Sequence, residues 1–201
     1  MRWVIGGVFA LLAMVAPAQA LPWGGVDLDA RGEIRPQLLE QALNAYERHQ
    51  EGQRLTRGMI MIVDYSKPSS EPRLHLLDLR SGAVRSLLVA HGRGSDPNHD
   101  GIADVFSDAN GSHASSLGAF RAAERYQGSH GLSLRLDGLD STNRSARARA
   151  IVLHSQWYVS PQMIAQRGAL GRSWGCFVVE RGAIEDVVAT LENGGFVYAG
   201  R

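Results

Sequence analysis

The residues with the clearest chemical potential are the only cysteine, Cys176, and a histidine shortly before it, His154. A thiol attacks carbonyl carbons well only as the thiolate, and its free pKa is about 8.5. A neighbouring imidazole can take the thiol proton and then stabilise the thiolate as an imidazolium. Gly175 precedes the cysteine and permits a sharp turn that exposes the sulfur and aims backbone N–H groups at an oxyanion. These residue types predict acyl transfer by a Cys–His pair.

A lone cysteine is not always a nucleophile. It can form an intermolecular disulfide, remain an inert buried thiol, or react. Cysteines in an oxidising compartment usually pair, and this chain begins like an exported protein. Arg2, the apolar run 3–15 and the small residues 18–20 have the order of an export signal with its cleavage site.

The chain is therefore expected to divide into a signal peptide (1–20), a lead-in with an N-terminal helix (21–57) and one catalytic domain (58–201). The apolar run is shorter than the roughly 20 residues that a membrane span needs, and no second run follows. We expect a periplasmic or cell-envelope protein with no stable membrane span after signal removal. An uncleaved anchor is the alternative.

The charge balance excludes one class of partner. The sequence has 21 basic and 20 acidic residues and no dense basic cluster, so we expect no nucleic-acid partner.

Short β-rich segments dominate the chain, so the fold class is expected to be mainly β (α+β), a sandwich or barrel with peripheral helices near both ends. Strands are expected at 59–65, 73–79, 83–90, 131–136, 148–153, 176–179 and 196–198, and helices at 36–49, 161–166 and 182–192. A long polar loop at 91–110 separates two groups of strands. In this scheme His154 ends one strand and Cys176 begins another, so both can lie at the same edge.

Several motifs in the right order resemble the L,D-transpeptidase catalytic domain of the YkuD-like superfamily. They are His154, a variable segment and Ser173-Trp174-Gly175-Cys176; the segment His91-Gly92-Arg93-Gly94-Ser95; and Ser115-Ser116-Leu117-Gly118-Ala119-Phe120. The resemblance covers roughly residues 58–198 and implies a fold of that type. Trp174 stands where most of the superfamily has a second histidine.

The resemblance implies catalytic roles for four positions. Cys176 matches the nucleophile and His154 the general base. Ser155 matches a residue whose main-chain carbonyl orients the imidazole, and Gly175 and Cys176 match the backbone donors of the oxyanion hole.

Substrate-binding candidates surround this group. An arginine can clamp a carboxylate of the stem peptide with two hydrogen bonds, so Arg172 is one candidate. Trp174 either shapes the pocket or is plain core packing. Ser173 is expected to cap the turn, and Tyr158 and His91 are the other candidates.

No cofactor or metal is expected. Residues 96–104 begin like a calcium loop, but Ser107 stands where the bidentate Glu is needed. The segment 129–137 has the wrong spacing for a zinc carboxypeptidase site.

By resemblance, the expected function is L,D-transpeptidation of peptidoglycan stem peptides through a thioester on Cys176, and acylation of that residue by carbapenems is expected as well. Two alternatives stay open. One is an L,D-carboxypeptidase or endopeptidase acting on the same stem peptides, and the other is a non-catalytic wall-binding module with a buried thiol.

Overall fold

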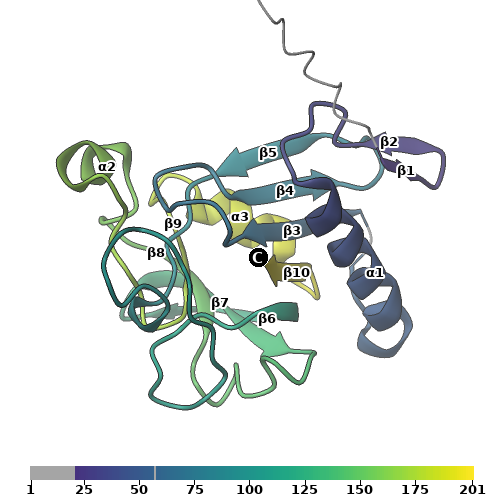
Figure 1. Cartoon of the computed structure of the whole chain (residues 1–201). Helices are drawn as coiled ribbons and strands as arrows, with labels where there is room; N and C mark the ends of the chain where they lie inside the picture. The colour runs from purple at the N-terminus through teal and green to yellow at the C-terminus, as the bar shows by residue number, and fades with distance from the viewer. Residues whose placement is uncertain (1–20, 57) are drawn as a thin grey trace, which may run out of the picture.

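The computed structural model describes residues 21–56 and 58–201 (Figure 1). The expected export signal lies outside these residues. The elements in chain order are β1 (Leu21–Trp23), β2 (Val26–Leu28), α1 (Pro36–Gln53), β3 (Met59–Asp64), β4 (Leu74–Asp78), β5 (Val84–Leu87), η1 (Arg93–Ser95), β6 (Gly118–Gly128), β7 (Gly131–Gly138), β8 (Val152–Ser155), α2 (Pro161–Arg167), β9 (Phe177–Val179), α3 (Ile184–Leu191) and β10 (Phe196–Gly200).

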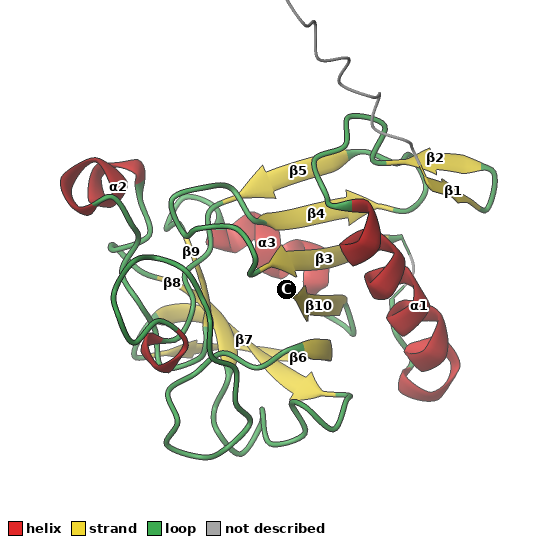
Figure 2. Cartoon of the chain, viewed as in Figure 1, coloured by secondary structure: helices red, strands yellow, loops and turns green. Residues whose placement is uncertain are grey.

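A large mixed sheet forms the body of the molecule (Figure 2). Its strand order is β5-β4-β3-β10-β6-β7-β8-β9, and β1 and β2 form a small separate hairpin. Isolated bridges from Ala90 to Val178 and from Gly92 to Ser173 connect the chain after β5 to the segment around β9. The two edges of the large sheet therefore meet, and the predicted mainly β fold with helices near both ends of the chain is confirmed.

The central strand β3 is buried on both faces because helices cover the sheet on both sides. Ile60 and Ile62 pack in one cluster with the apolar stripe of α1, while Met61 and Val63 pack in a second cluster that contains α3. This split follows from the two-residue period of a strand. Each such side chain contributes about 1.5–3 kcal/mol on full burial, so the sheet is a firm support for loops at its edge.

The strand that carries His154 begins later than expected. Residues 141–150 form successive turns, with hydrogen bonds from Ala150 N to Arg147 O and from Ile151 N to Ala146 O. Ala150 has a positive φ of 53° and ends this run of turns. The expected strand at 148–153 is therefore wrong at its start, and His154 lies inside β8 rather than after it.

The sequence patterns also missed β6, an 11-residue strand. Its pairing with β7 shifts register between Ala122 and Arg125, which marks a β-bulge. A bulge breaks the alternation of apolar and polar residues that identifies a strand. The β6–β7 hairpin matters here because its tip, at residues 129–130, helps to line the candidate site.

Candidate active site

Parallel pairing of β8 and β9 brings the candidate base and nucleophile together. Leu153 pairs with Phe177 and His154 with Val178, which places Cys176, one residue earlier, beside Val152. Leu153 and Phe177 point into the main apolar core. Alternate residues of a strand point to opposite faces, so His154 and Cys176 share the other face. Both line a cavity of about 590 Å³.

The Cys176 thiol is half-buried and held in the neutral form. Desolvation raises its pKa above the ordinary value of 9.0, and this outweighs the lowering effects of a hydrogen bond from the Val152 main chain and of the Arg149 charge. The sulfur lies 3.7 Å from Ala150 O, to which it donates its hydrogen bond, rather than to His154. At rest Cys176, the candidate nucleophile, is therefore a thiol.

The His154 imidazole is also neutral at rest. Burial lowers its pKa to about 4, although a hydrogen bond to the Ser155 main chain acts in the opposite direction. Nδ1 lies 3.2 Å from Ser155 O, and a carbonyl only accepts, so Nδ1 carries the hydrogen. Nε2 is then left with a free lone pair, which is the state that a general base needs. The contact expected of Ser155 is thus present.

His130, at the tip of the β6–β7 hairpin, is a site residue that the sequence patterns did not identify. Its ring stacks on the His154 ring with centroids 4.4 Å apart and planes 18° apart. Gln156 Nε2 lies 3.0 Å from His130 Nδ1 and fixes the ring from its edge. A positive charge on His130 would lower the pKa of His154 further. No spacing in the sequence signals this stack, because it depends on how the hairpin bends over β8.

Gly175 makes the turn before Cys176. Its φ is +108°, and a Cβ there would lie 2.6 Å from Ala114 O, so only glycine fits. Ser173 holds the same turn, since its hydroxyl donates to Cys176 O at 2.8 Å and accepts from Gly175 N at 3.1 Å. The Gly175 amide, expected to serve the oxyanion, is therefore already bound in the resting structure. Ser173 lines the cavity, but these hydrogen bonds serve its own turn.

Arg149 braces this turn and was not identified from the sequence. Its guanidinium donates to Ser107 O at 2.8 Å and to Ala114 O at 2.6 Å, and its side chain is 3% exposed. A Cβ on Gly175 would also lie 3.1 Å from Arg149 Nη2. The arginine therefore ties the loop at 107–116 to the turn that carries Cys176, and places a positive charge near the sulfur.

Aromatic side chains form the rim of the cavity. Trp174 is 66% exposed, so the core-packing interpretation is wrong. Its ring stacks on His113 with centroids 4.7 Å apart. Tyr158 lines the same cavity, where burial raises its pKa to about 12. Arg172 lines it as well.

The family model for the L,D-transpeptidase catalytic domain matches residues 30–199. The chain belongs to this family. In the comparison with curated proteins, none matches this chain.

Solved structures match with low identity. An L,D-transpeptidase from Mycobacterium smegmatis is 11% identical over 72% of this chain and 59% of its own, with a TM-score of 0.43. The L,D-transpeptidase LdtMt1, in complex with imipenem, is 13% identical over 71% and 59%, with a TM-score of 0.42. The helical cell shape determining protein Pgp2 from Campylobacter jejuni is 10% identical over 84% and 57%, also at 0.42. The chain spans about three fifths of the length of these structures.

His91 does not belong to the cavity of this L,D-transpeptidase domain, which corrects its expected place among the substrate-binding residues. It is 1% exposed and lies between Arg73 and Asp96. Arg73 Nη2 donates to His91 Nδ1 at 2.8 Å, so Nε2 carries the hydrogen that faces Asp96 Oδ2 at 3.2 Å. Burial lowers the pKa of His91 to about 4. The residue supports the loop structurally.

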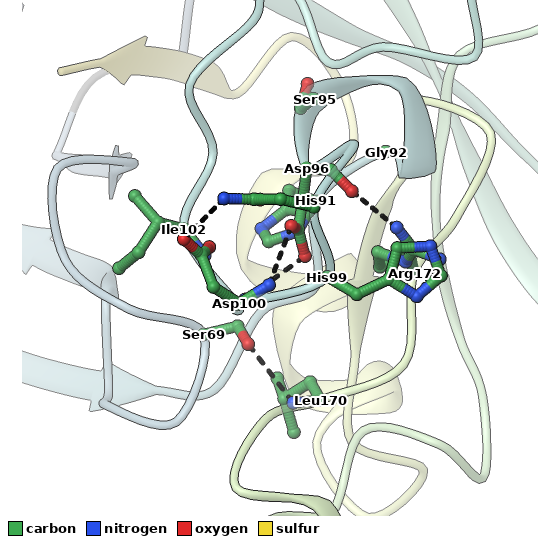
Figure 3. Close-up of polar contacts among 12 residues, drawn as sticks. Ser69, His91, Gly92, Ser95, Asp96, His99, Asp100, Ile102, Leu170 and Arg172 are labelled. Carbon is green, nitrogen blue, oxygen red and sulfur yellow. Dashed lines mark hydrogen bonds and ion pairs between the residues drawn. The ribbon is translucent and has the colours of Figure 1, made fainter.

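In the loop that resembles a calcium site, main-chain N–H groups of the loop itself donate hydrogen bonds to the carboxylates. Asp96 accepts from the main-chain N–H groups of Asp100 and Gly101, and Asp100 accepts from Ile102 N (Figure 3). Across residues 21–56 and 58–201, no cluster of three or more His, Cys, Asp or Glu side chains is placed to hold a metal ion. In the same residues no helix combines the length and apolar character of a membrane span.

Proposed function

We propose that this protein is an exported cysteine acyl-transferase that performs L,D-transpeptidation on peptidoglycan stem peptides. The observation that carries the proposal is the shared cavity: a half-buried thiol and an imidazole with a free Nε2 lone pair open into one space of about 590 Å³. Membership of the family supports the reaction class.

In the proposed reaction, Cys176 Sγ attacks the carbonyl carbon at the L-centre of diaminopimelate in a tetrapeptide stem. A C–S bond forms while the thiol proton moves to His154 Nε2. The tetrahedral intermediate collapses, its C–N bond breaks, and D-Ala leaves with the proton returned by His154. Backbone N–H groups at the turn stabilise the oxyanion. The Cys176 amide is the first candidate, because the Gly175 amide must first leave Ser173 Oγ.

The thioester then passes to an acceptor. An amine of a second stem attacks the thioester carbonyl and gives its proton to His154. The new C–N bond forms, the C–S bond breaks, and the sulfur recovers the proton from His154. Water in place of the amine would give L,D-carboxypeptidase action instead, with the same residues in the same roles.

Incubation of the purified protein with defined muropeptides tests this proposal. Disaccharide tetrapeptide donor and a second stem as acceptor should give a cross-linked dimer and free D-Ala by mass spectrometry, and Cys176→Ala should give neither. Release of D-Ala without a dimer would replace transpeptidation by hydrolysis. Failure of the wild-type protein to release D-Ala or to acquire the mass of an acyl group would reject the enzymatic proposal in favour of a wall-binding module.

Carbapenem acylation is a second arm of the same test. The strained lactam carbonyl offers the same electrophile to Cys176, so the intact protein should gain the mass of the drug. The gain should disappear in Cys176→Ala. Localisation in the cell envelope is part of the proposal and is checked by fractionation of cells that express the full chain.

A further inference from the structure

A second groove adjoins the cavity of Cys176. It has a volume of about 390 Å³ and is lined by Arg93, Arg167 and Arg172, together with Asp96, His99 and Trp174. Arg172 and Trp174 also line the catalytic cavity, so the two spaces share a wall. A chain that crosses Arg172 and Trp174 from the cavity would reach this groove.

The three arginines of the groove have no carboxylate partner among the described residues. Arg93 donates to His113 and lies over the Trp174 ring at 5.5 Å. Arg172 contacts Asp96 O and the His99 ring (Figure 3). Arg167, exposed in the last turn of α2, makes no polar contact within the described chain. Arg147, by contrast, is neutralised by Glu124 and Asp137.

The one acidic residue of the groove does not neutralise these cations. Asp96 is 2% exposed, and its two carboxylate oxygens accept from Asp100 N and Gly101 N and face His91. Only its main-chain oxygen reaches Arg172. The groove therefore presents positive charge to solvent without a counter-charge, which costs free energy by mutual repulsion. An external anion would relieve this repulsion.

We propose that the groove binds free carboxylates of the donor stem peptide whose reacting carbonyl lies at Cys176. This inference rests on the proposed function and names its donor subsite. A tetrapeptide stem carries carboxylates on D-Glu and on the D-centre of diaminopimelate, close to the reacting carbonyl. Guanidinium groups bind carboxylates through planar pairs of hydrogen bonds. Four extended residues reach about 14 Å, so one stem can occupy both spaces.

Equilibrium binding to the Cys176→Ala protein tests the groove without turnover. The ligands are a disaccharide tetrapeptide with free carboxylates and the same peptide with these carboxylates amidated. Arg167→Gln should weaken binding of the free-carboxylate peptide about three- to fivefold, and Arg167→Glu about tenfold or more, as expected for a solvent-exposed ion pair lost or reversed. Because Arg167 is exposed and makes no hydrogen bond or ion pair with the rest of the described chain, neither change should affect folding.

The controls assign the effect to charge in this groove. Arg181→Gln removes an arginine that is also exposed but lies outside the groove, and it should leave both affinities unchanged. The amidated peptide should bind with equal affinity to the Cys176→Ala protein that keeps Arg167 and to the one that also carries Arg167→Gln. Equal weakening of both peptides, or no weakening of either, would overturn the proposal.

Acylation kinetics separate donor from acceptor. With an active Cys176, the rate of thioester formation from donor alone at low concentration should fall about three- to fivefold in Arg167→Gln. An unchanged acylation rate combined with slower transfer to an acceptor would place the groove on the acceptor side and reject the donor assignment. If the wild-type protein forms no thioester, the proposed function fails, while the binding measurement still decides whether the groove binds stem carboxylates.

Discussion

Alkylation of Cys176 should accelerate with pH and show no plateau in the acidic range. The thiol pKa lies above 9.0 and the His154 pKa is about 4. Both shifts act against a resting thiolate–imidazolium pair, because burial favours the neutral form of each group. A free thiol with a pKa of about 8.5 is only about 3% thiolate at pH 7, and burial reduces that fraction further. The rate should therefore rise about tenfold per pH unit between pH 6 and pH 8.

Iodoacetamide with intact-mass detection measures this directly, because the sequence has no second cysteine to label. The wild-type protein and His154→Asn should give parallel pH profiles, and Cys176→Ser should give no label. A rate that stays level from pH 5 to pH 8 in the wild-type protein and loses this plateau in His154→Asn would demonstrate a resting ion pair. That result would refute the reasoning from burial.

Three further predictions concern the support of the site. Gly175→Ala should destabilise the fold by about 1–3 kcal/mol in thermal denaturation, because its methyl group meets Ala114 O at a positive φ; a normal midpoint would contradict this. His130→Phe should keep the ring stack but move the acidic limb of kcat/KM to higher pH, because loss of the His130 charge raises the pKa of His154; an unchanged limb would assign His130 no electrostatic role. Burial lowers the pKa of His75 to about 4, so below pH 6.5 the unfolded chain binds a proton at this residue that the folded protein does not. The free energy of unfolding should therefore fall between pH 6.5 and pH 4, by up to about 1.4 kcal/mol per pH unit. His75→Leu should reduce this pH dependence in urea titrations.

Periodic patterns predicted the elements that pack in regular ways. The apolar stripe of α1 was found because this helix buries one face. The continuous apolar run of β3 was found because this strand is buried on both faces. β6 was missed because its bulge interrupts the alternation, and the start of β8 was misplaced because turns held by Arg149 and its neighbours resemble extended chain in sequence.

The candidate site was predictable only where local sequence determines the geometry. The contact of His154 with the next residue's carbonyl and the glycine before the cysteine are local features, and both are present. The stack of His130 on His154 and the hydrogen bond from Arg149 to Ala114 O join segments that are far apart in sequence, so local patterns did not predict them. His91 was listed among the substrate-binding candidates from its place in a polar loop, but its contacts with Arg73 and Asp96 hold it in the interior.

The neutral resting state and the cationic groove fit a single physical scheme. A buried thiol and imidazole cost least when both are uncharged, so the pair needs the substrate before charge develops. A donor stem that covers the cavity would exclude water and strengthen the interaction of the nascent thiolate with the imidazolium and with Arg149. Solvent-exposed arginines at Arg93 and Arg167 would attract the stem without placing a cation beside His154, where it would lower the basicity of the imidazole. In this proposal Arg93 and Arg167, which line the groove but not the cavity of Cys176, would attract an anionic peptide while His154 stays neutral.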